Sequence, residues 1–195
     1  MIMKKRIILL GLVIAFALPT FAQSGTSRHA KNEISIGYGF HPVSGDDFLP
    51  KINYYRELDH VGAISAAYTR MIDTVVGVGI TYCYDPRIVD CYDLETHICS
   101  LDESCHSIMA HAKFNCFRYK FLLIYGKFDA GICFWDYRLQ EYHPENYEVI
   151  LPKGNCCFAW QYAFGVEANI GGFGLFAQQG LGMEGYVSFG IKYKF

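Results

Sequence analysis

The sequence lacks any uninterrupted apolar run of about 18 residues, the length that a membrane-spanning helix needs. Charged side chains are also scarce, at 18% of the 195 residues against roughly 25% in typical soluble domains. The formal net charge of −2 gives no basic surface, which argues against a nucleic-acid partner. Hydrophobic residues, by contrast, make up 52% of the chain, so it is too apolar to be disordered. What remains is one folded domain, rich in Gly, Tyr and Phe.

The first segment has the pattern of an export signal. Cations at positions 4–6 precede an apolar stretch over residues 7–18, and the small residues Thr20 and Ala22 suit a cleavage site. The apolar stretch is too short for a membrane anchor. We therefore predict that residues 1–22 are a cleaved signal peptide.

The remainder of the chain alternates apolar and small or polar residues with a period of two, which is typical of β-strands. The clearest case is the last stretch, where Val, Phe, Ile, Tyr and Phe at odd positions alternate with Ser, Gly, Lys and Lys. The pattern predicts eight strands, over residues 34–40, 64–69, 76–83, 108–115, 122–135, 158–170, 175–182 and 187–195.

Long and short connections follow one another along these strands. The long ones cover residues 41–61, 85–106 and 136–156, and the short ones residues 72–74, 118–120 and 171–172, and only the final link, residues 183–185, breaks the order. Up-and-down pairing then gathers the short turns at one rim and the long loops at the other, as in membrane barrels. The non-apolar face is mostly Gly, Ser, Ala and Thr, which suits a crowded lumen better than a water-facing surface. We predict an all-β fold, an eight-stranded antiparallel up-and-down transmembrane β-barrel facing outer-membrane lipid. A secreted soluble β-protein is the alternative.

The final strand resembles the terminal signature of bacterial outer-membrane barrels, because Phe195 is preceded by Tyr193, Ile191, Phe189 and Val187. The chain from residue 32 to 195 is similar to the small OmpA- and OmpX-like barrels, and residues 23–31 form an N-terminal linker. The resemblance implies the outer membrane of a Gram-negative bacterium. It also implies that the barrel-assembly machinery recognises the strand that ends in Phe195.

Several polar side chains are predicted to point into the lumen. Since buried charges must be paired or solvated, the mixture of signs on this face favours a structural plug of ion pairs. A proton or ion path is the alternative. The inward set is His111, Lys113, Lys127, Asp129, Gln161, Glu167, Gln178 and Lys192.

The eight cysteines permit disulfides in an exported protein, but the sequence does not choose a pairing. Five of them fall in or directly after the predicted long loops: Cys91, Cys99, Cys105, Cys156 and Cys157. His97 and His106 could join the loop cysteines in a zinc site, although the spacing matches no standard pattern. Cys116 is expected to face lipid as a small hydrophobe. We assign no residue to a metal or cofactor.

Catalysis is the last possibility that the residues raise. His41, Ser44, Asp46 and Asp47 cluster where the first strand ends, and Ser107 lies on the inward face together with His111. No Gly-x-Ser-x-Gly nucleophile motif is present, and Ser, Asp and His are common in solvated turns. We predict no catalytic residue and no enzyme.

The predicted role is structural, or an interaction of the long loops with an extracellular ligand. The acid-rich residues 85–106 could bind a cation or a basic partner. A lipid-modifying enzyme of the small-barrel type and a narrow porin are the alternatives.

Overall fold

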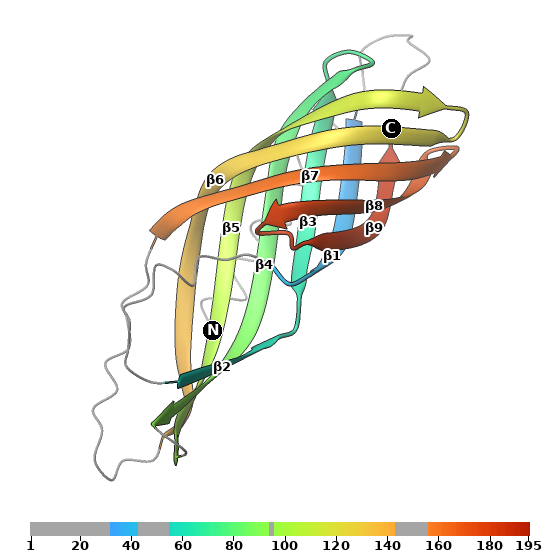
Figure 1. The fold of residues 1–195 in the computed structure, drawn as a ribbon. Coiled ribbons are helices and arrows are strands. Elements are labelled where there is room, and N and C mark those ends of the chain that lie inside the picture. Colours follow the sequence, from blue (N-terminus) through green and yellow to red (C-terminus); the bar gives the residue numbers. More distant parts are fainter. Residues whose placement is uncertain (1–31, 43–54, 94–95, 143–155) are drawn as a thin grey trace. The chain divides into compact units, whose positions relative to one another are not determined.

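The computed structural model describes residues 32–42, 55–93, 96–142 and 156–195. The predicted signal peptide, residues 1–22, and the predicted linker, residues 23–31, lie outside the described residues. Among the described residues no helix is long and apolar enough to cross a membrane. The strands are β1 (Asn32–Phe40), β2 (Tyr55–His60), β3 (Ala63–Met71), β4 (Val76–Asp93), β5 (Thr96–Tyr119), β6 (Leu122–Tyr142), β7 (Cys156–Ile170), β8 (Phe173–Gly182) and β9 (Val187–Lys194) (Figure 1).

The strands form one closed antiparallel sheet. Their order is β2-β4-β3-β1-β9-β8-β7-β6-β5, and a further pairing of β4 with β5 closes the ring. β2 and β3 both pair with β4, one beyond the other, and are separated only by Val61 and Gly62. They therefore act as one interrupted barrel strand, and the ring contains eight strands, as predicted. Gly62 has a φ of +102°, a conformation that disfavours a side chain at this interruption.

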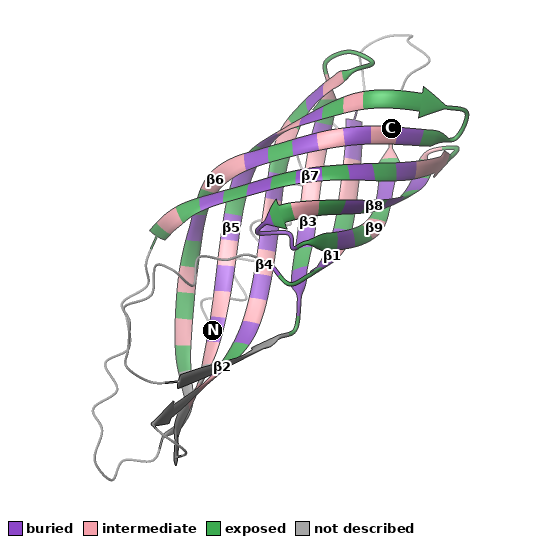
Figure 2. Cartoon of the chain, viewed as in Figure 1, coloured by how far each residue is buried: buried purple, intermediate pink, exposed green. Residues whose placement is uncertain are grey.

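Burial alternates along the strands, with inner residues buried and outer residues exposed (Figure 2). On β7, for example, Gln161 and Ala163 are 0% exposed whereas Tyr162 and Phe164 are 56% and 53% exposed. The exposed face is apolar and the buried face carries most of the polar groups, the reverse of a soluble protein. A closed sheet with an apolar outside has the architecture of outer-membrane barrels, because no backbone edge is left unpaired in lipid. The predicted fold is confirmed.

All three predicted long loops are wrong in extent, because strands continue into each of them. β4 and β5 pair from Val76↔Phe114 as far as Asp93↔Thr96, which takes up most of residues 85–106. β6 similarly extends to Tyr142, and β2 occupies the end of the first predicted loop. The acidic composition suggested a solvated loop. The period of two nevertheless persists, since Asp85, Arg87 and Glu103 are all buried.

Candidate functional site

The lumen contains the whole set of inward side chains predicted from the alternation. Each is at most 9% exposed, which confirms the predicted orientation of His111, Lys113, Lys127, Asp129, Gln161, Glu167, Gln178 and Lys192. Polar side chains at this depth require partners. These side chains form two networks, and each network joins residues from several strands across the lumen.

The first network joins two glutamates to three lysines inside the lumen. Lys113 Nζ donates to Glu33 Oε1 at 2.8 Å and to Glu167 Oε2 at 3.0 Å. Lys192 Nζ donates to Glu33 Oε1 at 3.1 Å and also to Glu167. Lys194 pairs with Glu167 and lies 3.6 Å from Glu33 Oε2. The network thereby links β1, β5, β7 and β9 across the lumen.

An aromatic side chain supports the same lysines. The Nζ atoms of Lys113 and Lys192 lie 4.7 Å and 5.0 Å from the centre of the Tyr125 ring, which suits cation–π attraction. The Tyr125 hydroxyl donates to Gln178 Oε1 at 3.0 Å, so the ring is held at its polar end as well. Tyr125 therefore connects the first network to the second.

The second network surrounds Lys127. Its Nζ donates to Glu184 Oε1 at 2.6 Å and lies 3.1 Å from Asp129 Oδ1. Gln178 Nε2 donates to the other oxygen of Glu184 at 2.5 Å. The backbone N–H of Glu184 donates to Gln161 Oε1 at 2.9 Å. The turn after β8 thus carries a carboxylate into the lumen.

His111 occupies the end of this second network. Thr81 Oγ1 donates its one proton to Asp129 Oδ1 at 2.7 Å, so it accepts a hydrogen bond from Nδ1 of His111 at 2.8 Å. Thr69 Oγ1 lies 2.9 Å from Nε2 of the same ring. Both ring nitrogens are therefore occupied by hydroxyl groups, which fixes the orientation of the imidazole.

Glycine on the inner face makes room for the large inward side chains. A Cβ at Gly165 would lie 2.7 Å from the Tyr125 hydroxyl, and one at Gly79 would lie 2.7 Å from Nε2 of His111. Both distances are shorter than real Cβ contacts. The small residues of the alternation are therefore needed by their neighbours in the lumen.

The networks leave little free space. The cavity between them has a volume of about 20 Å³, enough for roughly one water molecule. Its lining includes Lys113, Tyr125, Gln178, Glu184 and Lys192. The four lysines of the two networks are matched by four carboxylates, so their formal charges cancel.

Three charged members of these networks are missing from the predicted set. Glu33 comes one residue before the predicted first strand, and Lys194 belongs to the same alternation as Lys192. Extending the first strand by one residue would have found Glu33, and Lys194 already lies within the predicted last strand, on the same face as Lys192. Glu184 lies in a turn, where no periodicity applies, so no sequence signal points to it.

The candidate catalytic residues do not form a described site. His41 is exposed with a φ of +49°, and Ser44, Asp46 and Asp47 lie outside the described residues. Ser107 is fully buried beside Cys83, whereas His111 is engaged by Thr69 and Thr81.

The structure describes only some of the residues of the predicted zinc site and of the predicted loop cysteines. In the described part of the chain no three His, Cys, Asp or Glu side chains are arranged to hold a metal. The side chains of Cys91, His97 and Cys99 lie outside the description, although Cys91 and Cys99 are opposite one another in the backbone register. Cys116 is exposed at a bulge between Asn115 and Phe117, which agrees with the predicted lipid-facing position.

Comparisons with known proteins give structural neighbours only. No protein-family model matches the chain, and no curated protein matches it. The solved structures that resemble it include the outer membrane protein OprG from Pseudomonas aeruginosa, at 10% identity and a TM-score of 0.47, covering 86% of this chain and 97% of that chain. Ail, the attachment invasion locus protein of Yersinia pestis, has 14% identity and a TM-score of 0.46, covering 86% of this chain and 99% of that chain. Similarities at this level carry no argument about function.

Proposed function

We propose that this protein is an integral outer-membrane barrel with a non-enzymatic role, structural or in surface interaction, and with a lumen closed by ion pairs. The observation that supports the plug is the pair of luminal networks. Their lysines and carboxylates are matched in number, and the cavity between them is about 20 Å³. Barrels of eight strands are filled by their side chains, whereas water-filled porins use 16 or more.

The proposed interaction surface lies at the end of the barrel opposite the short turns. β4, β5 and β6 have 18, 24 and 21 residues, whereas β8 and β9 have only 10 and 8. The three long strands therefore continue beyond the level at which β8 and β9 end. Because outer-membrane barrels keep short turns in the periplasm, this extension would face the cell exterior. It is the part of the chain that we propose to contact an extracellular ligand.

The proposed partners inside the cell envelope follow from the surface and from the last strand. The exposed apolar face would contact outer-membrane lipid. The barrel-assembly machinery would recognise β9 and Phe195, whose backbone N–H and carbonyl both bond to Asn32 at 2.9 Å and 3.0 Å. Export of the chain from the cytoplasm to the barrel-assembly machinery would depend on the signal peptide proposed for residues 1–22.

Conductance through planar bilayers tests the plug. We expect purified wild-type protein to give no steady current, because the luminal charges are paired. The double variant Glu33→Ala, Glu167→Ala leaves three luminal lysines without carboxylates and should give brief openings. The matched control Asp136→Asn changes an exposed carboxylate on β6 and should behave as wild type. Large and stable steps from wild type would instead establish a narrow porin.

The enzymatic alternative has its own test. Membranes that contain the overproduced wild-type protein should show the same lipid A species, by mass spectrometry, as membranes without it. A new lipid A species that depends on the barrel would replace our proposal with the lipid-modifying enzyme.

A further inference from the structure

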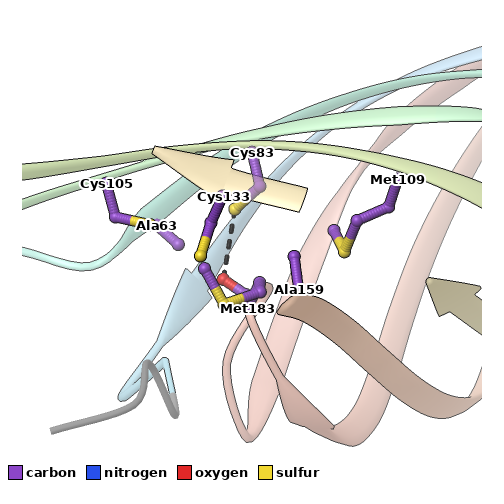
Figure 3. Packing of buried hydrophobic residues seen from close by; sticks show 7 residues of the cluster. All are labelled: Ala63, Cys83, Cys105, Met109, Cys133, Ala159 and Met183. Carbon is purple, nitrogen blue, oxygen red and sulfur yellow. Dashed lines mark hydrogen bonds between the residues drawn. The ribbon is translucent and has the colours of Figure 1, made fainter. Parts of the chain in front are cut away.

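A row of thiols crosses the inner face of the barrel beyond the ion networks. Cys83, Cys105, Cys133 and Cys157 belong to β4, β5, β6 and β7, which are consecutive neighbours in the ring. Cys133 follows Lys127 and Asp129 on the same face of β6, towards the end opposite the short turns. Figure 3 shows three of the thiols among Ala63, Met109, Ala159 and Met183. None of these thiols belongs to the ion networks.

Cys133 is the centre of the row. Its Sγ donates to the Cys157 carbonyl at 3.4 Å, and Cys105 on β5 and Cys157 on β7 are its neighbouring thiols in the row. Cys83 is engaged differently, since its Sγ donates to the carbonyl of Met183 at 3.1 Å (Figure 3). Cys133 therefore has a thiol on each of the two adjacent strands, and the backbone register must decide between Cys105 and Cys157 as its disulfide partner.

We propose that Cys133 and Cys157 form a cross-strand disulfide in the exported protein. The two residues are directly opposite in the register of β6 and β7. Directly opposed residues have Cα atoms about 4.5–5.5 Å apart, within the range of about 4.4–6.8 Å that a disulfide spans. In the register of β5 and β6, Cys133 is opposite Ser107, and Cys105 is opposite Trp135, two residues further along β6. It is therefore a diagonal neighbour, and diagonal pairs are separated by roughly 7–8 Å, beyond the usual disulfide range.

The accessibility of the two cysteines to an oxidant determines which of them reacts first. Cys157 is partly exposed near the start of β7, whereas Cys133 is 3% exposed. The oxidant would be a disulfide-bearing compound or oxidase of the cell envelope, where disulfides persist. The Cys157 thiolate attacks one sulfur of that disulfide, forming a mixed disulfide and releasing the first thiol. The Cys133 thiolate then attacks the Cys157 sulfur, releasing the second thiol. The two protons lost by the cysteines are taken up by the two released thiolates.

Peptide mapping tests the pairing, because trypsin separates the candidate cysteines. Residues 128–138 contain Cys133 alone, residues 154–192 contain Cys156 and Cys157, and residues 88–113 contain Cys91, Cys99 and Cys105. Wild-type protein would be extracted from membranes in the presence of N-ethylmaleimide, digested without reductant and analysed by mass spectrometry. We expect peptide 128–138 linked to peptide 154–192, and the link should disappear on reduction.

Single substitutions assign the sulfur atoms. The Cys156→Ser variant should keep the linked peptide, the Cys157→Ser variant should lose it, and Cys116→Ser is a control that should change nothing. The proposal is overturned if Cys133 and Cys157 of the membrane-extracted wild type are both alkylated. It is also overturned if Cys133 is linked to peptide 88–113, or if the link survives in Cys157→Ser. If a variant fails to fold, the wild-type map still shows whether Cys133 is linked to peptide 154–192, and fragmentation of the linked peptide between Cys156 and Cys157 shows which of the two carries the link.

Discussion

Lys113 on β5 and Glu167 on β7 meet inside the barrel, with Nζ and Oε2 3.0 Å apart, although β6 separates their strands in the ring. Both side chains are at most 3% exposed. A contact between strands that do not pair requires the sheet to curve until their inner faces approach each other. The ion pair is therefore a consequence of ring closure, and it also stabilises the closed ring.

Glu167→Gln is the direct test of this network. The substitution removes a charge that Lys113, Lys192 and Lys194 share, and leaves Glu33 as their nearby carboxylate. Removing one partner of a buried pair costs about 3–5 kcal/mol, since the other charge stays buried. We expect a loss of stability of that order, measured by urea unfolding of the barrel refolded in detergent.

A control and a second variant distinguish the loss of the buried ion pair from a nonspecific loss of stability. Asp136→Asn, on the exposed face of β6, should lie within about 0.5 kcal/mol of wild type. Adding Lys192→Gln to Glu167→Gln removes one of the three cations that are left to share Glu33, and should recover part of the loss. Equal stability of Glu167→Gln and wild type would show that the pair contributes nothing.

The alternation in the sequence predicted most of the barrel because lipid and lumen impose opposite demands on successive side chains. Tyr162 and Phe164 must face lipid, so Gln161 between Trp160 and Tyr162 must face inward. That reasoning fails where both faces become polar. The outer part of β4 was read as a loop because it contains Asp85, Arg87 and Asp90. In the structure Arg87 Nε donates to Asp85 Oδ2 at 2.8 Å, so charge pairing replaces apolar packing there.

The partners of the luminal charges were only partly predictable. The period of two assigns a residue to a face but does not say which residues meet across the ring. Glu184 shows this limit, because it reaches Lys127 from a turn and lies 57 positions away in the sequence. Such a contact depends on the diameter and stagger of the closed barrel, which are properties of the whole sheet.

Alanine substitutions at two glycines, one crowded and one open, test how closely the lumen is packed. A Cβ at Gly165 would lie 2.7 Å from the Tyr125 hydroxyl, whereas nothing lies within 4 Å of the position of a Cβ at Gly126. We expect Gly165→Ala to lose about 1–3 kcal/mol through overpacking, measured by urea unfolding. Gly126→Ala is the matched control and should be close to wild type. Combining Gly165→Ala with Tyr125→Ala should cost less than the sum of the two, because the ring that clashes is gone.

The C-terminal residue should decide whether the barrel assembles. Phe195 stacks on Tyr193 with ring centres 5.9 Å apart, and its backbone closes the ring against Asn32. Deleting Phe195, or replacing it with Asp, should reduce the folded barrel in the outer membrane, measured by the mobility difference between boiled and unboiled samples. Ser188→Ala removes a buried hydroxyl that has no hydrogen-bond partner, and should be tolerated. Normal folded levels of the Phe195 deletion would contradict the proposed recognition of this strand.

The turn between β3 and β4 gives a prediction about pH. Asp73 Oδ1 accepts hydrogen bonds from the backbone N–H of Val76 at 2.7 Å and of Val75 at 2.6 Å, and these bonds lower the pKa of the carboxyl. A pKa that is lower in the folded state stabilises the fold above the unfolded value of about 3.9, and the contribution is lost as the pH falls through the folded pKa. Asp73→Ala should therefore lower the urea midpoint by a constant amount between about pH 8 and pH 5, and the difference from wild type should shrink towards about pH 3. Thr74→Ala, which keeps the backbone carbonyl that accepts from Asn115, is the control. A difference between Asp73→Ala and wild type that persists unchanged at the lowest pH would mean that the carboxylate charge has no part in holding the turn.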